Sequence, residues 1–204
     1  MENKWGNKYS LIVIGASTGG PGVVRKILSD FPEDLPVPVA IVQHMPPEFT
    51  KGFAISLNEI SKLKVIEAGV REIMKAGYAY IAPGDKHIII KDISGQLVLK
   101  QNDDPEYSGH RPSVDKLFLS VTKIPDLAPK TIAVLLTGMG KDGGEGMKAL
   151  RDLGAFTIAQ TQETCVIFGM PGTAVKLGGV DISLNPEEIV PFILKKLREN
   201  QQQK

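Results

Sequence analysis

An apolar run that leads directly into a glycine-rich turn constrains the fold more than any other feature of this sequence. The run, LIVI at 11–14, predicts a strand over residues 9–15 that is buried on both faces. The turn is GASTGG at 15–20, and a helical pattern opens at its end. Strand, tight turn and helix in this order, around Gly-x-Ser-x-Gly, are the context of a nucleophile elbow. We therefore expect Ser17 to be exposed at the N-terminus of the helix, where partial positive charge favours a developing anion.

The alternation of strand and helix continues along the chain. Further buried strands are predicted at 37–43, 131–136 and 155–159. Helical patterns follow the first two, with Phe49 and Leu153 among the residues expected to face the core. Such alternation favours parallel strands joined by right-handed crossovers. We predict an α/β fold, a doubly wound and mostly parallel sheet with helices on both faces.

The middle of the chain has a different pattern. Short extended runs at 65–66, 78–82, 86–93 and 96–100 are separated by glycines, and the turn at 94–95 is typical of a hairpin. We interpret this section as an antiparallel β-hairpin insertion or edge, and not as further strand–helix units.

The rest of the chain carries three more predicted elements. A helix at 112–124 follows a polar loop, 166–168 is expected to be extended, and 172–177 is expected to be a short helix. The last helix has the clearest boundaries, with Asn185 as its cap and Pro186 at its first position.

Composition limits the classes of protein that remain. The 204 residues suit one domain, which we place at 9–198, with flexible ends at 1–8 and 199–204. A net charge of +1 gives no indication of a nucleic-acid-binding surface. No apolar run approaches the ~18 residues of a spanning helix, so we expect no membrane insertion. The single Cys165 excludes an internal disulfide, is expected to be a small buried hydrophobe, and fits the cytoplasmic location that we expect.

Three predicted strands end near residues that together suit nucleophilic catalysis. The first leads to Ser17, the second to His44, and the strand at 131–136 lies a few residues before Asp142. Sites in open parallel sheets form beyond the carboxyl ends of the strands. Ser17 would attack a carbonyl, His44 would take and return the proton, and Asp142 would orient the imidazole. The backbone amide of Thr18 is a candidate oxyanion donor, and the glycines around Asp142 offer more.

A non-catalytic nucleotide- or phosphate-binding module is the main alternative for the glycine-rich turn. The dinucleotide fingerprint requires a Gly-x-Gly that Ser17 interrupts, and an acidic residue closing the second strand, where Gln43 and His44 stand. The Gly-Lys-Ser/Thr of a P-loop is also absent. The chain order Ser, His, Asp differs from the Ser, Asp, His of α/β-hydrolases, which argues against that family and not against a triad.

Other titratable residues compete for these roles. His87 lies on a predicted hairpin strand and is interpreted as structural, whereas His110 is a loop residue placed to line a substrate groove. Asp85 and Asp115 are rivals of Asp142, but only Asp142 follows a buried parallel strand. The histidines and the cysteine include no pair at the short spacing typical of metal ligands, so we expect no metal. We expect no organic cofactor either.

Seven motifs together strongly resemble the catalytic domain of the chemotaxis protein-glutamate methylesterases, in the family's order and over about residues 9–197. The motifs are GASTGG (15–20), QHMPPEFT (43–50), YIAPGDKH (80–87), HRPSVD (110–115), LTGMGKDG (136–143), TIAQ (157–160) and CVIFGMP (165–171). The resemblance implies a doubly wound α/β sheet and hydrolysis of glutamyl γ-methyl esters on chemoreceptors, with release of methanol. Some members of the family also deamidate receptor glutamines.

The resemblance also implies the site residues. The family's triad falls on Ser17, His44 and Asp142, and its second oxyanion-hole amide falls on Met139. Family members usually carry an N-terminal receiver domain, but too few residues precede the first predicted strand for a further domain. We therefore expect an excised catalytic domain or a stand-alone variant. A catalytically idle receptor-docking domain is a third, weaker alternative.

Overall fold

The computed structural model describes residue 6 and residues 8–199, so most of the two predicted flexible ends lies outside the described residues. A seven-stranded sheet runs through the centre in the order β10-β9-β8-β1-β2-β5-β3, and every neighbouring pair in it is parallel. Its strands are β1 (Leu11–Ala16), β2 (Val39–Gln43), β3 (Lys64–Glu67), β5 (Tyr78–Ile81), β8 (Thr131–Leu135), β9 (Phe156–Gln160) and β10 (Ile182–Leu184).

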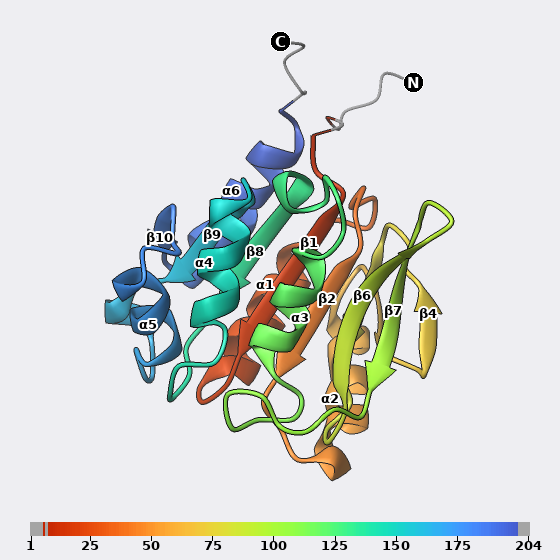
Figure 1. Cartoon of the computed structure of the whole chain (residues 1–204), viewed down its shortest axis with the longest axis horizontal. Coiled ribbons are helices and arrows are strands. Elements are labelled where there is room, and N and C mark those ends of the chain that lie inside the picture. The colour runs from red at the N-terminus through yellow and green to blue at the C-terminus, as the bar shows by residue number, and fades with distance from the viewer. Residues whose placement is uncertain (1–5, 7, 200–204) are drawn as a thin grey trace.

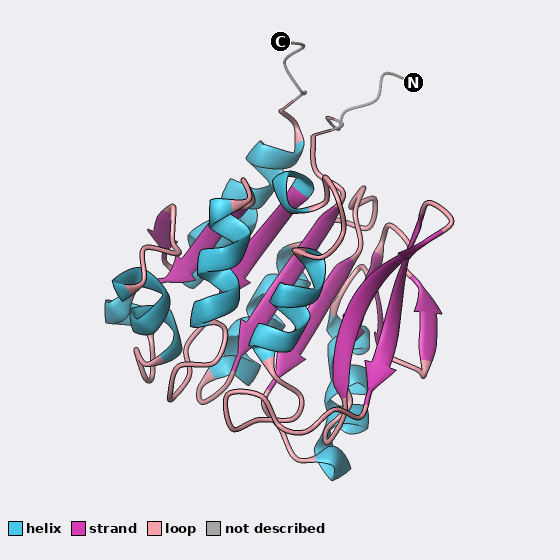
Figure 2. Cartoon of the chain, viewed as in Figure 1, coloured by secondary structure: helices cyan, strands magenta, loops and turns pink. Residues whose placement is uncertain are grey.

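Helices cover both faces of this sheet (Figures 1 and 2). One face packs against α1 (Gly20–Asp30), α2 (Pro47–Ile60) and α6 (Pro186–Leu197), and the other against α3 (Val114–Val121), α4 (Gly144–Asp152) and α5 (Met170–Lys176). The central strands are fully buried because both faces are covered, which explains their continuous apolar sequence. The predicted doubly wound α/β fold is therefore confirmed. No helix in the described part of the chain has both the length and the hydrophobicity to cross a bilayer.

The prediction of an antiparallel insertion is right for only part of the middle section. β5 lies parallel to β2, with Ala79 opposite Val39, and β3 lies parallel to β5, with Val65 opposite Ala79. Only β6 (His87–Ile93) and β7 (Gln96–Asn102) form the predicted hairpin, and β4 (Arg71–Ile73) extends it into a second sheet beside α3. The connection from β3 to β5 passes through β4 and not through a helix, so the helical period that marks a parallel crossover is missing.

Some smaller expectations also differ from the structure. Phe49 and Leu153 are 58% and 50% exposed, because one lies in the first turn of α2 and the other caps the end of α4. Residues 166–168 form no strand; Phe168 makes a single bridge with Gly138. The strand β10 was not predicted, since its three residues are only partly buried and show no apolar run.

Candidate active site

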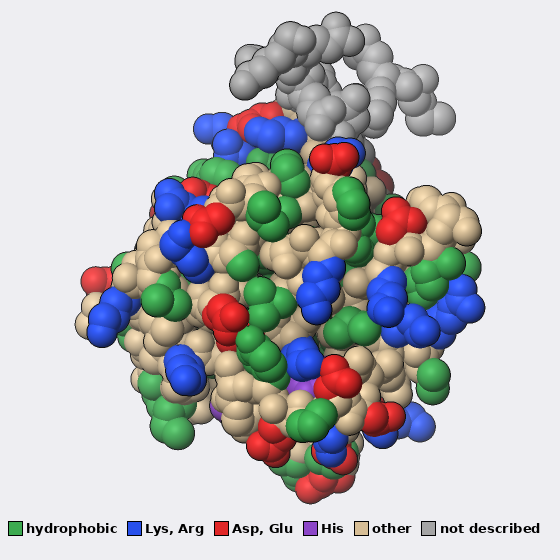
Figure 3. Space-filling model, in the orientation of Figure 1, with side chains coloured by type: hydrophobic (Ala, Val, Ile, Leu, Met, Phe, Trp, Pro, Cys, Tyr) green, Lys and Arg blue, Asp and Glu red, His purple; other side chains and the backbone are tan. Residues whose placement is uncertain are grey.

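The register of the central strands brings Ser17 and His44 together. β1 and β2 are parallel, with Ala16 opposite Gln43, so the next residue of each strand leaves the sheet at the same edge. The backbone amide of His44 donates to the Ala16 carbonyl at 3.0 Å. β8 borders the other side of β1, and the Ser17 amide donates to the Thr137 carbonyl at 3.0 Å. Acidic, basic and apolar side chains are mixed at this lower edge, where a histidine is visible (Figure 3).

The turn at Ser17 has the strand–turn–helix form that the sequence predicts. The Gly20 amide donates to the Ser17 carbonyl at 2.8 Å, and α1 begins at Gly20. Gly19 has φ of 81°, and a Cβ built there would lie 2.5 Å from Val166, so only glycine suits this position. Ser17 is half-buried, and its hydroxyl makes no hydrogen bond to another described residue. The hydroxyl is therefore available to a substrate.

The sequence did not indicate the role of Gln43, which ties the two strand ends together. This buried side chain donates from Nε2 to the carbonyl of Ser17 at 3.0 Å and to that of His44 at 3.1 Å. In the sequence, Gln43 could have been noticed as a side-chain amide that stands between an apolar strand and the candidate base His44. Gln43 thus holds the turn of Ser17 at a set distance from the backbone of His44.

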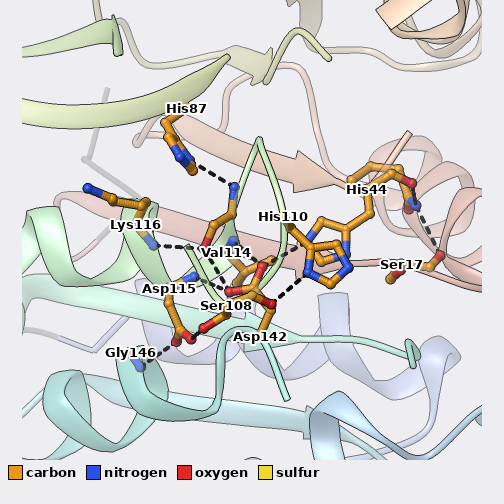
Figure 4. Close-up of polar contacts among 12 residues, drawn as sticks. Ser17, His44, His87, Ser108, His110, Val114, Asp115, Lys116, Asp142 and Gly146 are labelled. Atoms are coloured by element: carbon orange, nitrogen blue, oxygen red, sulfur yellow. Dashed lines mark hydrogen bonds and ion pairs between the residues drawn. The ribbon is translucent and has the colours of Figure 1, made fainter. Parts of the chain in front are cut away.

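His44 contacts Asp142 directly, with its Nε2 2.7 Å from Oδ2 of the carboxylate. Its other ring nitrogen, Nδ1, is buried without a hydrogen-bond partner in the described chain. Ser17 lies on the side of His44 away from Asp142 (Figure 4). In chymotrypsin-like triads Nδ1 faces the aspartate and Nε2 faces the serine, so this imidazole is used in the opposite sense. Nδ1 is the ring nitrogen that does not contact Asp142.

The N-terminus of α3 holds Asp142, whose side chain is fully buried. Oδ2 also accepts from the Val114 amide at 2.7 Å, and Oδ1 accepts from Ser113 Oγ at 2.8 Å and the Asp115 amide at 2.9 Å. Burial by itself would raise the pKa of Asp142, but the hydrogen bonds from His44 and the Asp115 amide outweigh it and hold the pKa below its ordinary value. Asp142 is therefore a carboxylate next to His44, as its proposed role requires.

Asp115 and His87, two rivals considered from the sequence, support this cradle and do not face Ser17. Asp115 is buried and accepts from the Gly146 amide at 2.7 Å. His87 is fully buried, and burial is the main cause that lowers its pKa. Its Nδ1 accepts from the Ser113 amide at 3.1 Å, and its Nε2 donates to the Pro105 carbonyl at 3.1 Å. The structural interpretation of His87 is confirmed.

The third histidine, His110, lies flat on the ring of His44. The ring centroids of His44 and His110 are 3.8 Å apart and the ring planes differ by 9°. Both rings border a hollow of about 290 Å³, which is also lined by Met45, Pro46, Glu106, Gly109, Arg111 and Pro112. The prediction that His110 could line a groove beside the site agrees with this position, but the stacking on His44 was not predicted.

Two backbone amides near Ser17 are available to an oxyanion. Neither the Thr18 amide nor the Met139 amide donates a hydrogen bond to another residue that the structure describes. The loop of Met139 is close to the nucleophile, since a Cβ built on Gly138 would lie 2.7 Å from Ser17 Cβ. The Gly138 carbonyl accepts from the amides of Gly169 and Met170, at 3.1 and 2.9 Å, which holds this loop in place. The arrangement supports both candidate donors.

The cluster of His44, His110 and Asp142 is poorly arranged for a metal ion, although their ligand atoms lie within 4.8 Å of one another. The ring-nitrogen lone pairs of the two stacked histidines lie in two nearly parallel planes, so they do not converge on one ion. Both carboxylate oxygens of Asp142 already accept two hydrogen bonds each.

The carboxyl edge of this doubly wound parallel sheet carries a serine, a histidine and an aspartate, the residue types of a serine-hydrolase triad. The sequence model of one family, CheB methylesterase, matches residues 12–193. The chain belongs to this family, as the motifs indicated.

Individual relatives agree with this assignment. The chain is 41% identical over 191 residues to a protein-glutamate methylesterase/protein-glutamine glutaminase of Hydrogenovibrio crunogenus, covering 92% of this chain and 50% of that protein. It is 44% identical to the protein of the same name from Salmonella typhimurium, covering 94% and 54%. The chain thus spans about half the length of these curated relatives. The crystal structure of the Thermotoga maritima CheB methylesterase catalytic domain matches with a TM-score of 0.88 and 39% identity, over 92% of this chain and 98% of that one.

Proposed function

We propose that residues 9–198 form a catalytic domain that hydrolyses the γ-methyl esters of glutamate side chains in chemoreceptors and releases methanol. The observation that carries this proposal is the contact between His44 and Asp142 at the same sheet edge as Ser17. It couples a buried carboxylate to a half-buried imidazole beside a serine with a free hydroxyl. Membership of the CheB methylesterase family supports the choice of an ester substrate.

The residues supply each step of acyl transfer. Ser17 Oγ attacks the ester carbonyl while His44 Nδ1 takes its proton, and Asp142 stabilises the imidazolium that forms. The amides of Thr18 and Met139 donate to the oxyanion of the tetrahedral intermediate. When the intermediate collapses, methoxide leaves with the proton from His44, as methanol. Water then attacks the acyl-enzyme with the same base and releases glutamate and free Ser17.

The same steps also suit a primary amide. With a glutamine side chain in place of the methyl ester, the leaving group is ammonia, and the second half of the reaction is unchanged. The name shared by the relatives covers both activities, which supports deamidation as a second reaction of this site. No step calls for a metal or an organic cofactor.

The partner that we propose is the cytoplasmic helical bundle of a methyl-accepting receptor. This partner places the enzyme in the cytoplasm.

The test is methanol release from methylated receptor by the wild type and by Ser17→Ala. We expect turnover to fall by about 10³–10⁴-fold or more, and an active-serine probe to label the wild type alone. Ser183→Ala, at an exposed position of β10, is the matched control and is expected to keep full activity. Wild-type turnover by Ser17→Ala would end the proposal. Saturable nucleotide binding that is lost on changing Gly19 would favour the alternative phosphate-binding module.

A further inference from the structure

We infer that His110 is a positioning residue for the general base: its ring forms a flat support that holds the His44 imidazole between Asp142 and Ser17. The inference rests on the proposed role of His44. It starts from the stack of the two rings, with 3.8 Å between centroids and 9° between planes, at a position where ring orientation decides the proposed chemistry.

A single hydrogen bond does not set the orientation of His44. The contact from Nε2 to Asp142 at 2.7 Å holds one ring atom, and the ring remains free to tilt about it. The second nitrogen, Nδ1, has no partner among the described residues that would stop this motion. The terminal torsion of a histidine is also broad, so the side chain by itself does not select one plane. Contact across a whole ring face restricts the tilt that the hydrogen bond allows.

His110 is itself held firmly enough to serve as a support. Its Nδ1 donates to the Ser108 carbonyl at 3.0 Å, and its backbone pairs with that of Tyr107 through two hydrogen bonds of 3.1 Å. The next residue, Arg111, donates to Asp85 from Nε at 2.9 Å and from an Nη at 2.6 Å. The loop is thus anchored directly before and directly after the stacked ring.

The same loop is anchored to the cradle of the catalytic carboxylate. Ser108 Oγ donates to Asp115 Oδ2 at 3.0 Å, and the Asp115 amide donates to Asp142. His44 is therefore held on one face by His110 and at one edge by Asp142, and both supports are connected to the start of α3 (Figure 4).

Two matched substitutions distinguish the contribution of the His110 ring from that of its hydrogen bond. His110→Phe keeps a flat ring and removes both nitrogens, whereas His110→Gln keeps a polar side chain and removes the ring. In methyl ester hydrolysis we expect His110→Gln and His110→Ala to lower kcat about 10- to 100-fold with KM within about twofold, since small misplacement of a catalytic group costs this much. His110→Phe should restore most of the lost kcat.

A signal from His44 provides a readout that does not depend on activity. The chain has 3 histidines, so the ring protons of His44 can be assigned by NMR from single substitutions. The ring current of a stacked neighbour shifts these protons, and we expect the shift to persist in His110→Phe and to vanish in His110→Gln. Thermal unfolding of each variant tests whether it is folded, and the Phe and Gln variants decide the question if Ala does not fold.

Three results would overturn the inference. They are wild-type kcat in both His110→Ala and His110→Gln, a rise in KM with unchanged kcat, which would make His110 a substrate contact, and rescue by Gln but not by Phe. Failure of the proposed function is distinct from all three, because it would appear as full turnover by Ser17→Ala while the NMR comparison still reports the stack.

Discussion

Asp142, just before α4, and Asp115, in α3, each accept amide hydrogen bonds from the first turn of the helix next to the other residue. Asp142, two residues before α4, accepts from the Val114 and Asp115 amides in the first turn of α3, and Asp115 in α3 accepts from the Gly146 amide in the first turn of α4. The positive ends of both helices thus stabilise this pair of neighbouring carboxyl groups. Burial, and then the charge of Asp142, raise the pKa of Asp115 to about 6, while the pKa of Asp142 is lowered. A proton that enters the pair therefore resides on Asp115, and Asp142 stays ionised beside His44.

Asp142→Asn should cost both activity and stability. The amide removes the charge that stabilises the imidazolium, and we expect kcat to fall by about 10⁴-fold. The NH₂ group of asparagine also replaces an acceptor oxygen, so at least one of the donors that now bind the carboxylate loses its acceptor. We expect this loss to cost about 1–3 kcal/mol of unfolding free energy. Methanol release and urea unfolding measure the two effects.

Ser113→Ala is the companion to this substitution. It removes one neutral donor to Asp142 and leaves the charge in place, so its effect on kcat should be far smaller than that of Asp142→Asn. Equal losses of activity in the two variants would contradict the role of the charge.

Asp115→Asn should change how stability depends on pH. In the folded state Asp115 holds its proton up to a pKa of about 6, against an ordinary value of 3.8. Between these values the native state binds more protons than the unfolded state, so the contribution of Asp115 to stability decreases as pH rises through this window. From pH 4 to pH 7 the wild type should lose about 2 kcal/mol relative to Asp115→Asn.

Urea unfolding of both proteins at pH 4, 5, 6 and 7 measures this difference. Asp92→Asn, on the exposed end of β6, is the control and should follow the wild-type curve. If the difference in unfolding free energy between the wild type and Asp115→Asn stays constant over this pH range, the assignment of the proton to Asp115 is contradicted.

The positions of Ser17, His44 and Asp142 could be predicted because each of them is indicated by a local sequence pattern. An apolar run followed at once by a polar residue marks the carboxyl end of a buried strand, and that rule places Ser17 and His44 at one edge. Asp142 is found in the same way, although it lies in the loop after β8. In the strand order of the sheet, β1, which leads to Ser17, lies between β2, which leads to His44, and β8, which precedes Asp142.

The parts that could not be predicted depend on contacts between distant segments. Ser113 meets Asp142 across 29 residues of sequence, and the stack of His110 on His44 joins two loops that share no periodic pattern. β3 and β5 were misplaced for a related reason, since a parallel pair without a helix between its strands carries no crossover signal. In each case the partner is set by packing and leaves no pattern in the local sequence.

His87 should make the protein less stable in mild acid. Burial lowers its pKa below 6.5, so the unfolded state binds the proton more readily and stability falls as pH drops below 6.5. His87→Asn removes this titration and the hydrogen bond to Pro105, and it should be less stable than the wild type at pH 8 by about 1–3 kcal/mol. The gap should narrow at pH 5.5. Denaturant unfolding of both proteins at pH 8 and pH 5.5 measures this gap. An equal difference in unfolding free energy at the two pH values would contradict the prediction.

Gly169→Ala should disturb the loop that carries the candidate oxyanion amide of Met139. A Cβ on Gly169 would lie 2.8 Å from the Gly138 carbonyl oxygen and 2.9 Å from the Gly140 nitrogen, and backbone cannot yield as a flexible side chain does. The loop of Met139 must therefore shift from its present position relative to Gly169. We expect kcat to fall by about 10²-fold, because an oxyanion donor is displaced, together with a lower melting temperature.

Gly52→Ala is the matched control for this substitution. Gly52 lies inside α2 with no atom within 4 Å of a Cβ built on it. We expect wild-type kcat and a gain of about 0.5–1 kcal/mol in stability, since alanine favours the helix. If Gly169→Ala keeps wild-type kcat while its melting temperature falls, the loop supports the fold alone, and the amide of Met139 is not an oxyanion donor.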